Sequence, residues 1–108
     1  MVKIMDKKEL SDLREVCIQL ETIMQKHSGN YYKSQIKALY DIVNCIDSDD
    51  NEEKITKYII SRYKVLYPSH GGLNEFYIDN DDFEKRLKLN EPLDKLKERL
   101  WSFFKLYV

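Results

Sequence analysis

Apolar residues recur at helical spacing through most of the chain. The first stripe has intervals of three and four residues, at Leu10, Leu13, Cys17, Leu20 and Met24. Such intervals place the apolar side chains on one face of an amphipathic helix that packs on a core. Asp6, with Glu9 three residues later, has the pattern of a capping box, and Gly29 is a typical helix end. The pattern therefore predicts a first helix over residues 6–27.

A second stripe follows after a very short connection. It consists of Tyr32, Ile36, Leu39, Val43 and Ile46, with Tyr40 and Ile42 beside it. Asn30 is a residue type that caps helices, so we expect a helix over residues 30–46. Only Ser28, Gly29 and Asn30 separate the two predicted helices. A connection this short makes them antiparallel neighbours.

A third helix is predicted over residues 51–66, after the polar segment that begins at Asp47. Its inward residues are Ile55, Ile59, Tyr63 and Leu66. The acids at its start suit the positive end of the helix dipole. Pro68, followed by Gly71 and Gly72, predicts the end of this helix. Residues 73–78 show no clear period, and we expect them to be extended or to form a single turn.

The C-terminal part of the chain predicts two more helices. Asn80 is expected to cap a short helix over residues 81–89, with Phe83 and Leu87 directed inward. A last, long helix is expected to begin at residues 90–92, because Pro92 is tolerated in a first turn. Its inward residues are Leu93, Leu96, Leu100, Phe103 and Tyr107, with Trp101 and Phe104 adjacent.

The composition agrees with an all-α fold. The 108 residues include only 3 Gly and 2 Pro, whereas β-hairpins and tight turns depend on those residues. Charged residues make up 34% and hydrophobic residues 43%, a mixture that suits amphipathic helices. We therefore expect one domain over residues 1–108, an antiparallel four-helix-bundle-like fold. It would contain a short extra helix and an irregular segment before the last long helix.

Charge and hydropathy restrict the environment of the protein. The 18 basic and 19 acidic residues leave a net charge of -1, so no overall field would attract nucleic acid or anionic lipid. No apolar run has the length of a signal-peptide core or a membrane span, and we expect a soluble, cytoplasmic protein. Cys17 and Cys45 both lie on apolar stripes. We expect two buried thiols, although a disulfide between them is geometrically possible.

The sequence contains no recognisable catalytic group. His27 is expected at a helix C-terminus, where the dipole favours its charged form. His70 precedes Gly71 and Gly72, whose backbone amides could bind an anion, with His70 as a proton donor. The alternative is a helix-terminating turn in which glycine supplies a positive φ. We expect no enzymatic activity and no cofactor.

Metal binding is also not expected. Asp47, Asp49 and Asn51 stand at alternate positions, as in a calcium-binding EF-hand loop. Such a loop requires Gly at its sixth position and Glu at its twelfth, where this chain has Glu52 and Tyr58. The sequence offers no ligand set with the spacing of a zinc site.

The cations of the third helix suggest a nucleic-acid interface only weakly. Lys54, Lys57, Arg62 and Lys64 alternate with tyrosines. Glu52, Glu53 and the preceding aspartates offset these cations, so we interpret them as a solvated helix face and expect no nucleic-acid partner.

Two acidic segments, residues 47–53 and 75–84, are the most unusual feature of the chain. One interpretation is a set of helix-capping acids beside core aromatics. The other is a surface that binds a basic protein, in which aromatic anchors lie within an acidic rim. On the second interpretation the partner-binding residues are Asp49, Asp50, Glu53, Tyr77, Asp79, Asp81 and Asp82.

Residues Pro68–Ile78 (PSHGGLNEFYI) and Asp82–Asp94 (DFEKRLKLNEPLD) resemble a signature of small helical bacterial proteins. Some similar proteins are immunity proteins of contact-dependent growth inhibition and other polymorphic toxin systems. The resemblance implies a cytosolic, non-enzymatic protein that binds and blocks a cognate toxin domain. It implies no catalytic residues. A homodimeric structural or regulatory helical protein remains the alternative.

Overall fold

The computed structural model describes residues 3–108, and every regular element in that range is a helix. The order along the chain is α1 (Lys7–His27), α2 (Lys33–Ile46), α3 (Glu52–Ser61), α4 (Tyr63–Leu66), the 3-10 helix η1 (Leu73–Glu75) and α5 (Phe83–Phe104). The predicted all-α class is confirmed.

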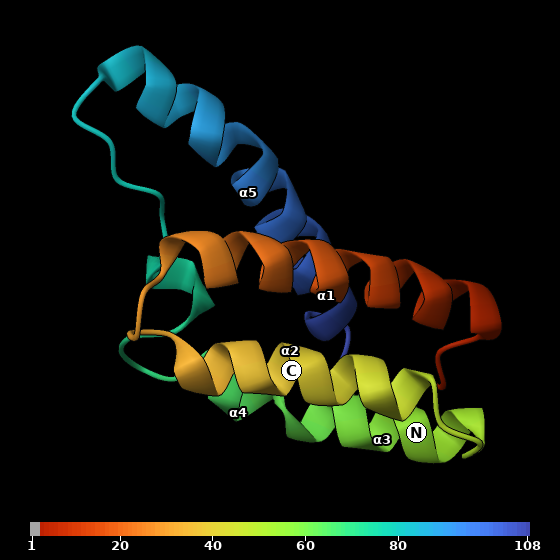
Figure 1. Ribbon diagram of the computed structural model, residues 1–108. Coiled ribbons are helices and arrows are strands. Elements are labelled where there is room, and N and C mark those ends of the chain that lie inside the picture. Colours follow the sequence, from red (N-terminus) through yellow and green to blue (C-terminus); the bar gives the residue numbers. More distant parts are fainter. Residues whose placement is uncertain (1–2) are drawn as a thin grey trace.

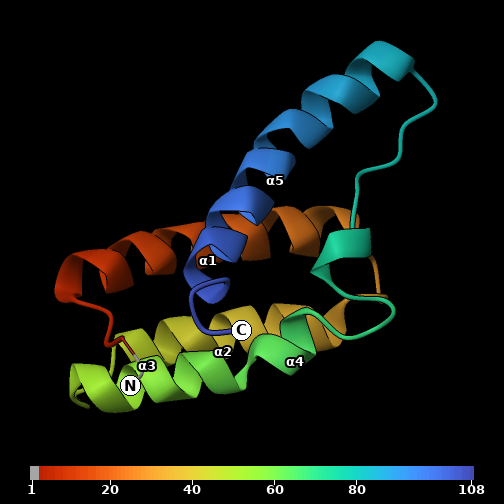
Figure 2. The same ribbon diagram turned by 180° about the vertical axis from the view of Figure 1, so that it is seen from behind.

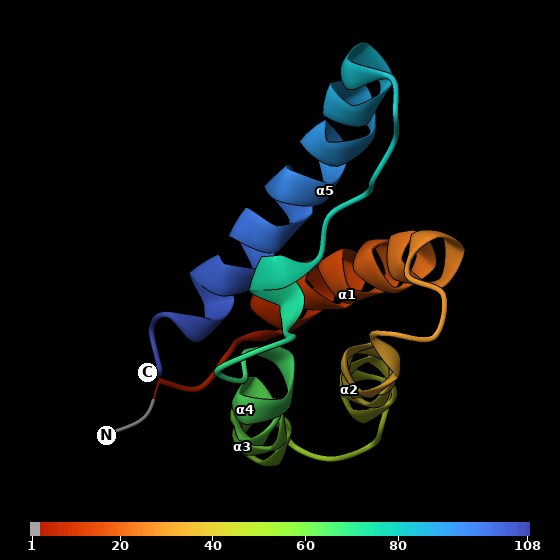
Figure 3. The same ribbon diagram turned by 90° about the vertical axis from the view of Figure 1, so that its left-hand side faces the viewer.

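The helices form an elongated body with one projecting arm (Figure 1). Helices α1 and α2 run antiparallel, and α3 with α4 returns beside α2. Helix α5 crosses α1 obliquely on the side away from α2, which Figure 2 shows from behind. Figure 3 shows that the C-terminal end of α5 returns to the body, whereas its first turns extend well beyond α1.

The N-terminal helix forms as its local sequence predicts. A carboxylate oxygen of Asp6 accepts a hydrogen bond from the Glu9 amide at 2.8 Å, and Glu9 accepts in return from the Asp6 amide at 3.4 Å, which completes the capping box. Gly29, with a φ of 58°, follows the helix end at Ser28. All five residues of the predicted stripe are buried.

Helix α2 differs from the prediction at its start and in its buried face. The predicted cap at Asn30 is wrong, because the helix begins at Lys33 and Tyr32 occupies the cap position without a side-chain hydrogen bond. The fully buried residues are Gln35, Ala38, Leu39 and Ile42, whereas Tyr32, Ile36, Val43 and Ile46 are only half-buried. The buried face is turned because α2 packs against α1 and also against α3 and α4. Gln35 is part of this contact, donating a hydrogen bond to the Val65 carbonyl at 2.9 Å.

The predicted third helix starts where expected but divides into α3 and α4. Asn51 caps it by accepting a hydrogen bond from the Lys54 amide at 2.9 Å. The single helix over residues 51–66 is wrong, because the chain breaks at Arg62. There the Ser61 hydroxyl donates to the Tyr58 carbonyl, and the Arg62 amide donates to the Ile59 carbonyl instead of continuing the α-helical pattern.

The two C-terminal helices predicted from the sequence are one helix, α5, with Pro92 in its interior. Proline has no amide hydrogen, so the helix lacks the hydrogen bond from residue 92 to the Lys88 carbonyl. The cap is Asp82, which accepts from the Lys85 amide at 3.1 Å; the Asn80 cap is wrong. Leu93, Leu96, Leu100 and Phe104 are buried, and the predicted inward residues Phe103 and Tyr107 are half-buried. Phe83 and Leu87 are exposed, which contradicts their predicted inward direction.

The interior is closed by aromatic packing between α4 and α5. The rings of Tyr63, Tyr67, Trp101 and Phe104 lie 5.4–6.3 Å apart by centroid. Cys17 is fully buried, and burial raises the pKa of its thiol to about 12. Cys45 is only half-buried, so the prediction of two buried thiols holds for Cys17 alone. Within the described residues neither cysteine forms a disulfide.

Candidate protein-binding surface

An extended segment, residues 76–82, leads from the body to the start of α5. Successive side chains of extended backbone point to opposite sides. Phe76 and Ile78 are buried, whereas Tyr77 is 62% exposed and Asp79 is exposed as well. Phe76 packs edge-on against the Tyr32 ring at 5.1 Å. The alternation therefore anchors the segment on one side and presents Tyr77 to solvent on the other.

Asn90 joins this segment to α5. Its side-chain oxygen accepts from the Ile78 amide, and its side-chain nitrogen donates to the carbonyls of Ile78 and Arg86, all at 2.8 Å. Lys97 donates to the Phe76 carbonyl at 2.9 Å, and burial lowers the pKa of its ammonium group. Helix α5 is thereby held against the extended segment by three side-chain hydrogen bonds.

Replacing Asn90 with Ala is expected to lower the free energy of unfolding by about 1–3 kcal/mol, because the half-buried Ile78 amide and carbonyl lose their partners. Amide hydrogen exchange at Ile78 should accelerate at the same time. Asn44→Ala is the matched control, since Asn44 is exposed on α2. Unchanged protection of the Ile78 amide in Asn90→Ala would show that Asn90 does not hold the segment.

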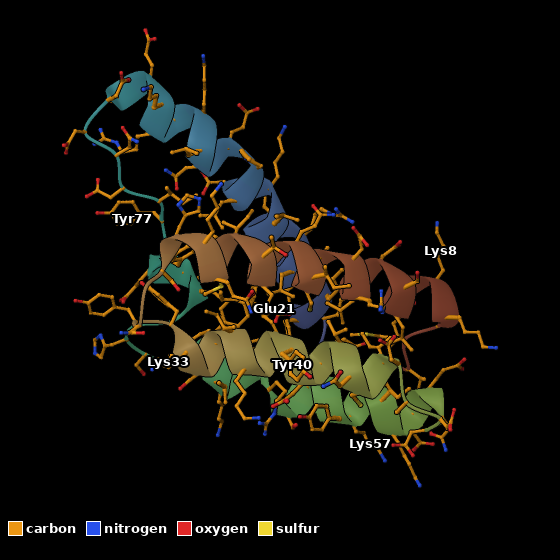
Figure 4. The ribbon with its side chains drawn as sticks, in the orientation of Figure 1. Lys8, Glu21, Lys33, Tyr40, Lys57 and Tyr77 are labelled. Atoms are coloured by element: carbon orange, nitrogen blue, oxygen red, sulfur yellow. The ribbon has the colours of Figure 1, made fainter. Side chains whose placement is uncertain are left out.

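Two apolar side chains in the first turns of α5 are also exposed, whereas Tyr77 lies near the body end of the extended segment (Figure 4). Phe83 is 61% exposed and Leu87 is 56% exposed. Residues four apart on a helix share a face, so the two side chains form one short stripe. We call the set Tyr77, Asp79, Asp81, Asp82, Phe83 and Leu87 the tip surface.

The stripe has acidic neighbours on its helix. Glu84 and Glu91 stand three residues before and four residues after Leu87, so they flank it directly. Lys85 and Lys88 fall further around the helix, at roughly 100–160° from the stripe for about 100° per residue. The Glu84–Glu91 flank therefore borders the stripe on one side, and Arg86 borders Phe83 on the other.

The three predicted acids of the tip surface have different structural roles. Asp82 caps α5 and also donates its backbone amide to the Asn80 side chain at 2.9 Å. Asp79 and Asp81 are exposed and have no side-chain hydrogen bond within residues 3–108. Arg86 is stacked over the Phe83 ring at 5.4 Å, which fixes the orientation of that ring. Asp79 and Asp81 are therefore the acids free to meet a partner.

The other predicted partner-binding residues, Asp49, Asp50 and Glu53, lie at the opposite end of the body, at the turn between α2 and α3. Figure 4 shows this separation through Tyr77 beside the arm and Lys57 on α3. Glu53 pairs with Lys57 at 3.1 Å. The expectation of one rim built from both acidic segments is therefore wrong, because the sequence does not show how the helices separate them.

Asp50 lines a hollow of about 330 Å³ between α1 and the start of α3. The floor is apolar, from Leu10, Ile46 and Ile55. Beside it Arg14 donates two hydrogen bonds to Asp47, at 2.7 and 3.1 Å, and this pairing lowers the pKa of the Asp47 carboxyl. Of the hydroxyl groups that line the hollow, that of Ser48 donates to the Cys45 carbonyl at 2.6 Å and not to a carboxylate.

In the turn that contains His70, a carboxylate of the same protein occupies the backbone amide that could bind an external anion. The Gly71 amide donates to a carboxylate oxygen of Glu75 at 2.6 Å, and Gly71 has a φ of 75°. His70 is exposed. Of the two interpretations, the helix-terminating turn is confirmed, and the backbone site is filled by Glu75.

Within residues 3–108, no group of three or more His, Cys, Asp or Glu side chains has the arrangement to hold a metal ion. The helices in that range are too short or too polar to cross a bilayer.

Phe83 and Leu87 are binding candidates that the sequence interpretation assigned to the core. A signal for them was present: in one continuous helix, Leu87 and Leu93 are six residues apart and so point about 120° apart. Placing a helix boundary at Asn90 concealed that offset.

Comparison of the chain with protein-family models, with curated proteins and with solved structures found no match in any of the three. The fold itself defines only the class of the protein, which is small and all-helical with a projecting arm.

Proposed function

We propose that this protein is a non-catalytic binding module that engages a basic partner protein through the tip surface. The observation that carries the proposal is the exposure of Tyr77, Phe83 and Leu87 on a projecting arm that side-chain hydrogen bonds hold in place. A surface that is already ordered before binding loses little conformational entropy on association. The scaffold we propose for it is a bundle-like packing of α1, α2, α3 and α5.

The tip surface has the composition of an interface centre with a charged rim. Exposed aromatic side chains supply most of the binding energy in many interfaces. Asp79, Asp81 and Glu84 are exposed near them in the sequence and would steer a basic surface into contact. The partner is therefore expected to present cations around an apolar recess.

We propose further that the partner is a cognate toxin domain. The stretches that resemble immunity proteins, residues 68–78 and 82–94, contain Tyr77, Phe83 and Leu87, so they overlap the tip surface. Toxin domains that cut nucleic acid are usually basic around their active sites. An acidic surface can occupy such a site in place of the phosphate backbone.

Co-expression is the direct test of this role. The gene immediately upstream should encode a large secreted protein with a variable C-terminal domain, and cells producing that domain should be rescued by this protein. Failure of rescue with both proteins soluble would contradict the immunity role.

The tip surface is tested with purified proteins. The variant D79K/D81K/D82N keeps a capping side chain at position 82 and should slow association with the toxin domain about tenfold or more, with a weaker dependence on salt. D49K/D50K is the matched control, because it reverses acids at the other end of the body. Equal effects of the two variants on association kinetics would exclude the tip surface as the binding site.

A second copy of the chain is the alternative occupant of the exposed Phe83–Leu87 stripe. Sedimentation velocity of the protein alone distinguishes a homodimer from a monomer whose tip surface is free for another protein. A dimer that Leu87→Asp converts to a monomer would support the homodimer and contradict a free tip surface.

A further inference from the structure

The groove between α2 and the α3–α4 break carries a cluster of hydrogen-bond donors. It has a volume of about 210 Å³ and is lined by Ser34, Lys37, Ala38, Asp41, Arg62 and Val65. Ala38 and Val65 form an apolar floor, and Ser34, Lys37 and Arg62 supply hydroxyl, ammonium and guanidinium groups at its edge. The Arg62 side chain stands there because the helix ends at that residue.

The charge around this groove is positive. Lys37 pairs with Asp41 at 2.9 Å, which raises the pKa of the Lys37 ammonium group, and Arg62 lies close enough to act on the same charge. Arg62 has no carboxylate partner within residues 3–108. Lys33, one turn before Lys37, adds a further cation (Figure 4).

The acids that offset these cations in the sequence are elsewhere in the structure. Glu53 is engaged by Lys57, and Asp47 is engaged by Arg14 of α1. The remaining acids of that segment lie at the far end of α3 from Arg62. Sequence proximity therefore overstated the neutralisation of Arg62, and the acid that the groove does contain, Asp41, pairs with Lys37.

Two tyrosines lie beside the cations. Tyr40 is 53% exposed on α2, and Tyr58 lies under the Arg62 guanidinium, whose central carbon is 5.4 Å from the ring centroid. Tyr58 is also close enough to Lys37 to affect its charge, which places it on the groove side of α3. An exposed aromatic ring beside cations, such as Tyr40, is the arrangement on which a base of a single strand stacks, whereas Tyr58 is half-buried and supports Arg62. An acidic peptide would use the cations but would have no need of the rings.

We propose that this face, defined by Lys33, Lys37, Tyr40, Tyr58 and Arg62, binds single-stranded nucleic acid. The cations contact successive phosphates, Tyr40 stacks on a base, and Tyr58 positions Arg62. The site is separate from the tip surface and does not depend on the proposed function.

Fluorescence anisotropy with a labelled 12-nucleotide oligouridine tests the inference. Three phosphate contacts predict a slope of log affinity against log salt of about −2, so affinity should fall roughly 20-fold between 50 and 200 mM salt. K37E/R62E should weaken binding at least tenfold, and Tyr40→Ala at least fivefold. K95E/R99E, on the outer face of α5, changes the net charge equally and is the matched control.

The alternatives give distinct outcomes. Absence of binding at 50 mM salt overturns the inference, as does an equal loss in K37E/R62E and K95E/R99E. Competition by polyglutamate as effective as by unlabelled oligouridine, with Tyr40→Ala unaffected, would assign the face to an acidic polypeptide instead. Circular dichroism of each variant verifies that the helices are retained.

Discussion

Replacing Leu100 with Ala is expected to lower the free energy of unfolding by about 2–5 kcal/mol. Leu100 is fully buried, near the middle of the packed part of α5. Truncation removes apolar contacts and leaves a cavity that a close-packed interior fills only in part. Because domains of this size are stable by only about 5–15 kcal/mol, the loss is large. Leu20 and Leu39, which are equally buried, should give losses in the same range.

Leu87→Ala is the matched control for this measurement, since it makes the same change on the same helix at an exposed position. Urea unfolding should show a loss within about 0.5 kcal/mol. A loss as large as that of Leu100→Ala would mean that the arm packs on the body in solution, and the tip surface would not exist as described.

Replacing Gly72 with Ala is expected to cost about 1–3 kcal/mol. A β-carbon at this position would lie 2.5 Å from Pro68 Cδ and 2.8 Å from the Leu66 carbonyl oxygen. Both distances are shorter than van der Waals contact. Because the Leu66 oxygen is a backbone atom, the turn after α4 must shift to admit the β-carbon. Thermal or urea unfolding measures the cost.

Gly71→Asn serves as the control for Gly72→Ala. Gly71 has a φ of 75°, but the space around it is open, and Asn tolerates positive φ better than most residues. Its cost should stay below about 1 kcal/mol. Wild-type stability in Gly72→Ala would contradict the close approach of residue 72 to the α4 turn.

The sequence by itself determined the features that depend on neighbouring residues. The capping box of Asp6 and Glu9, the helix end near Gly29 and the Asn51 cap all arise within a few residues. The buried stripe of α1 was also predictable, because α1 packs on both α2 and α5. The acids of the candidate surface, Asp79 and Asp81, could be named from composition alone.

Only the tertiary structure decided which apolar residues are covered. Phe83 and Leu87 have the four-residue spacing of a core stripe, but because α5 continues through Pro92 and extends past α1, nothing within residues 3–108 covers them. The separation of the two acidic segments and the turned face of α2 also result from how helices distant in the sequence pack together. Periodicity specifies that a helix forms and which side is apolar. Burial of that side depends on a second element that is distant in the sequence, and no local pattern carries that information.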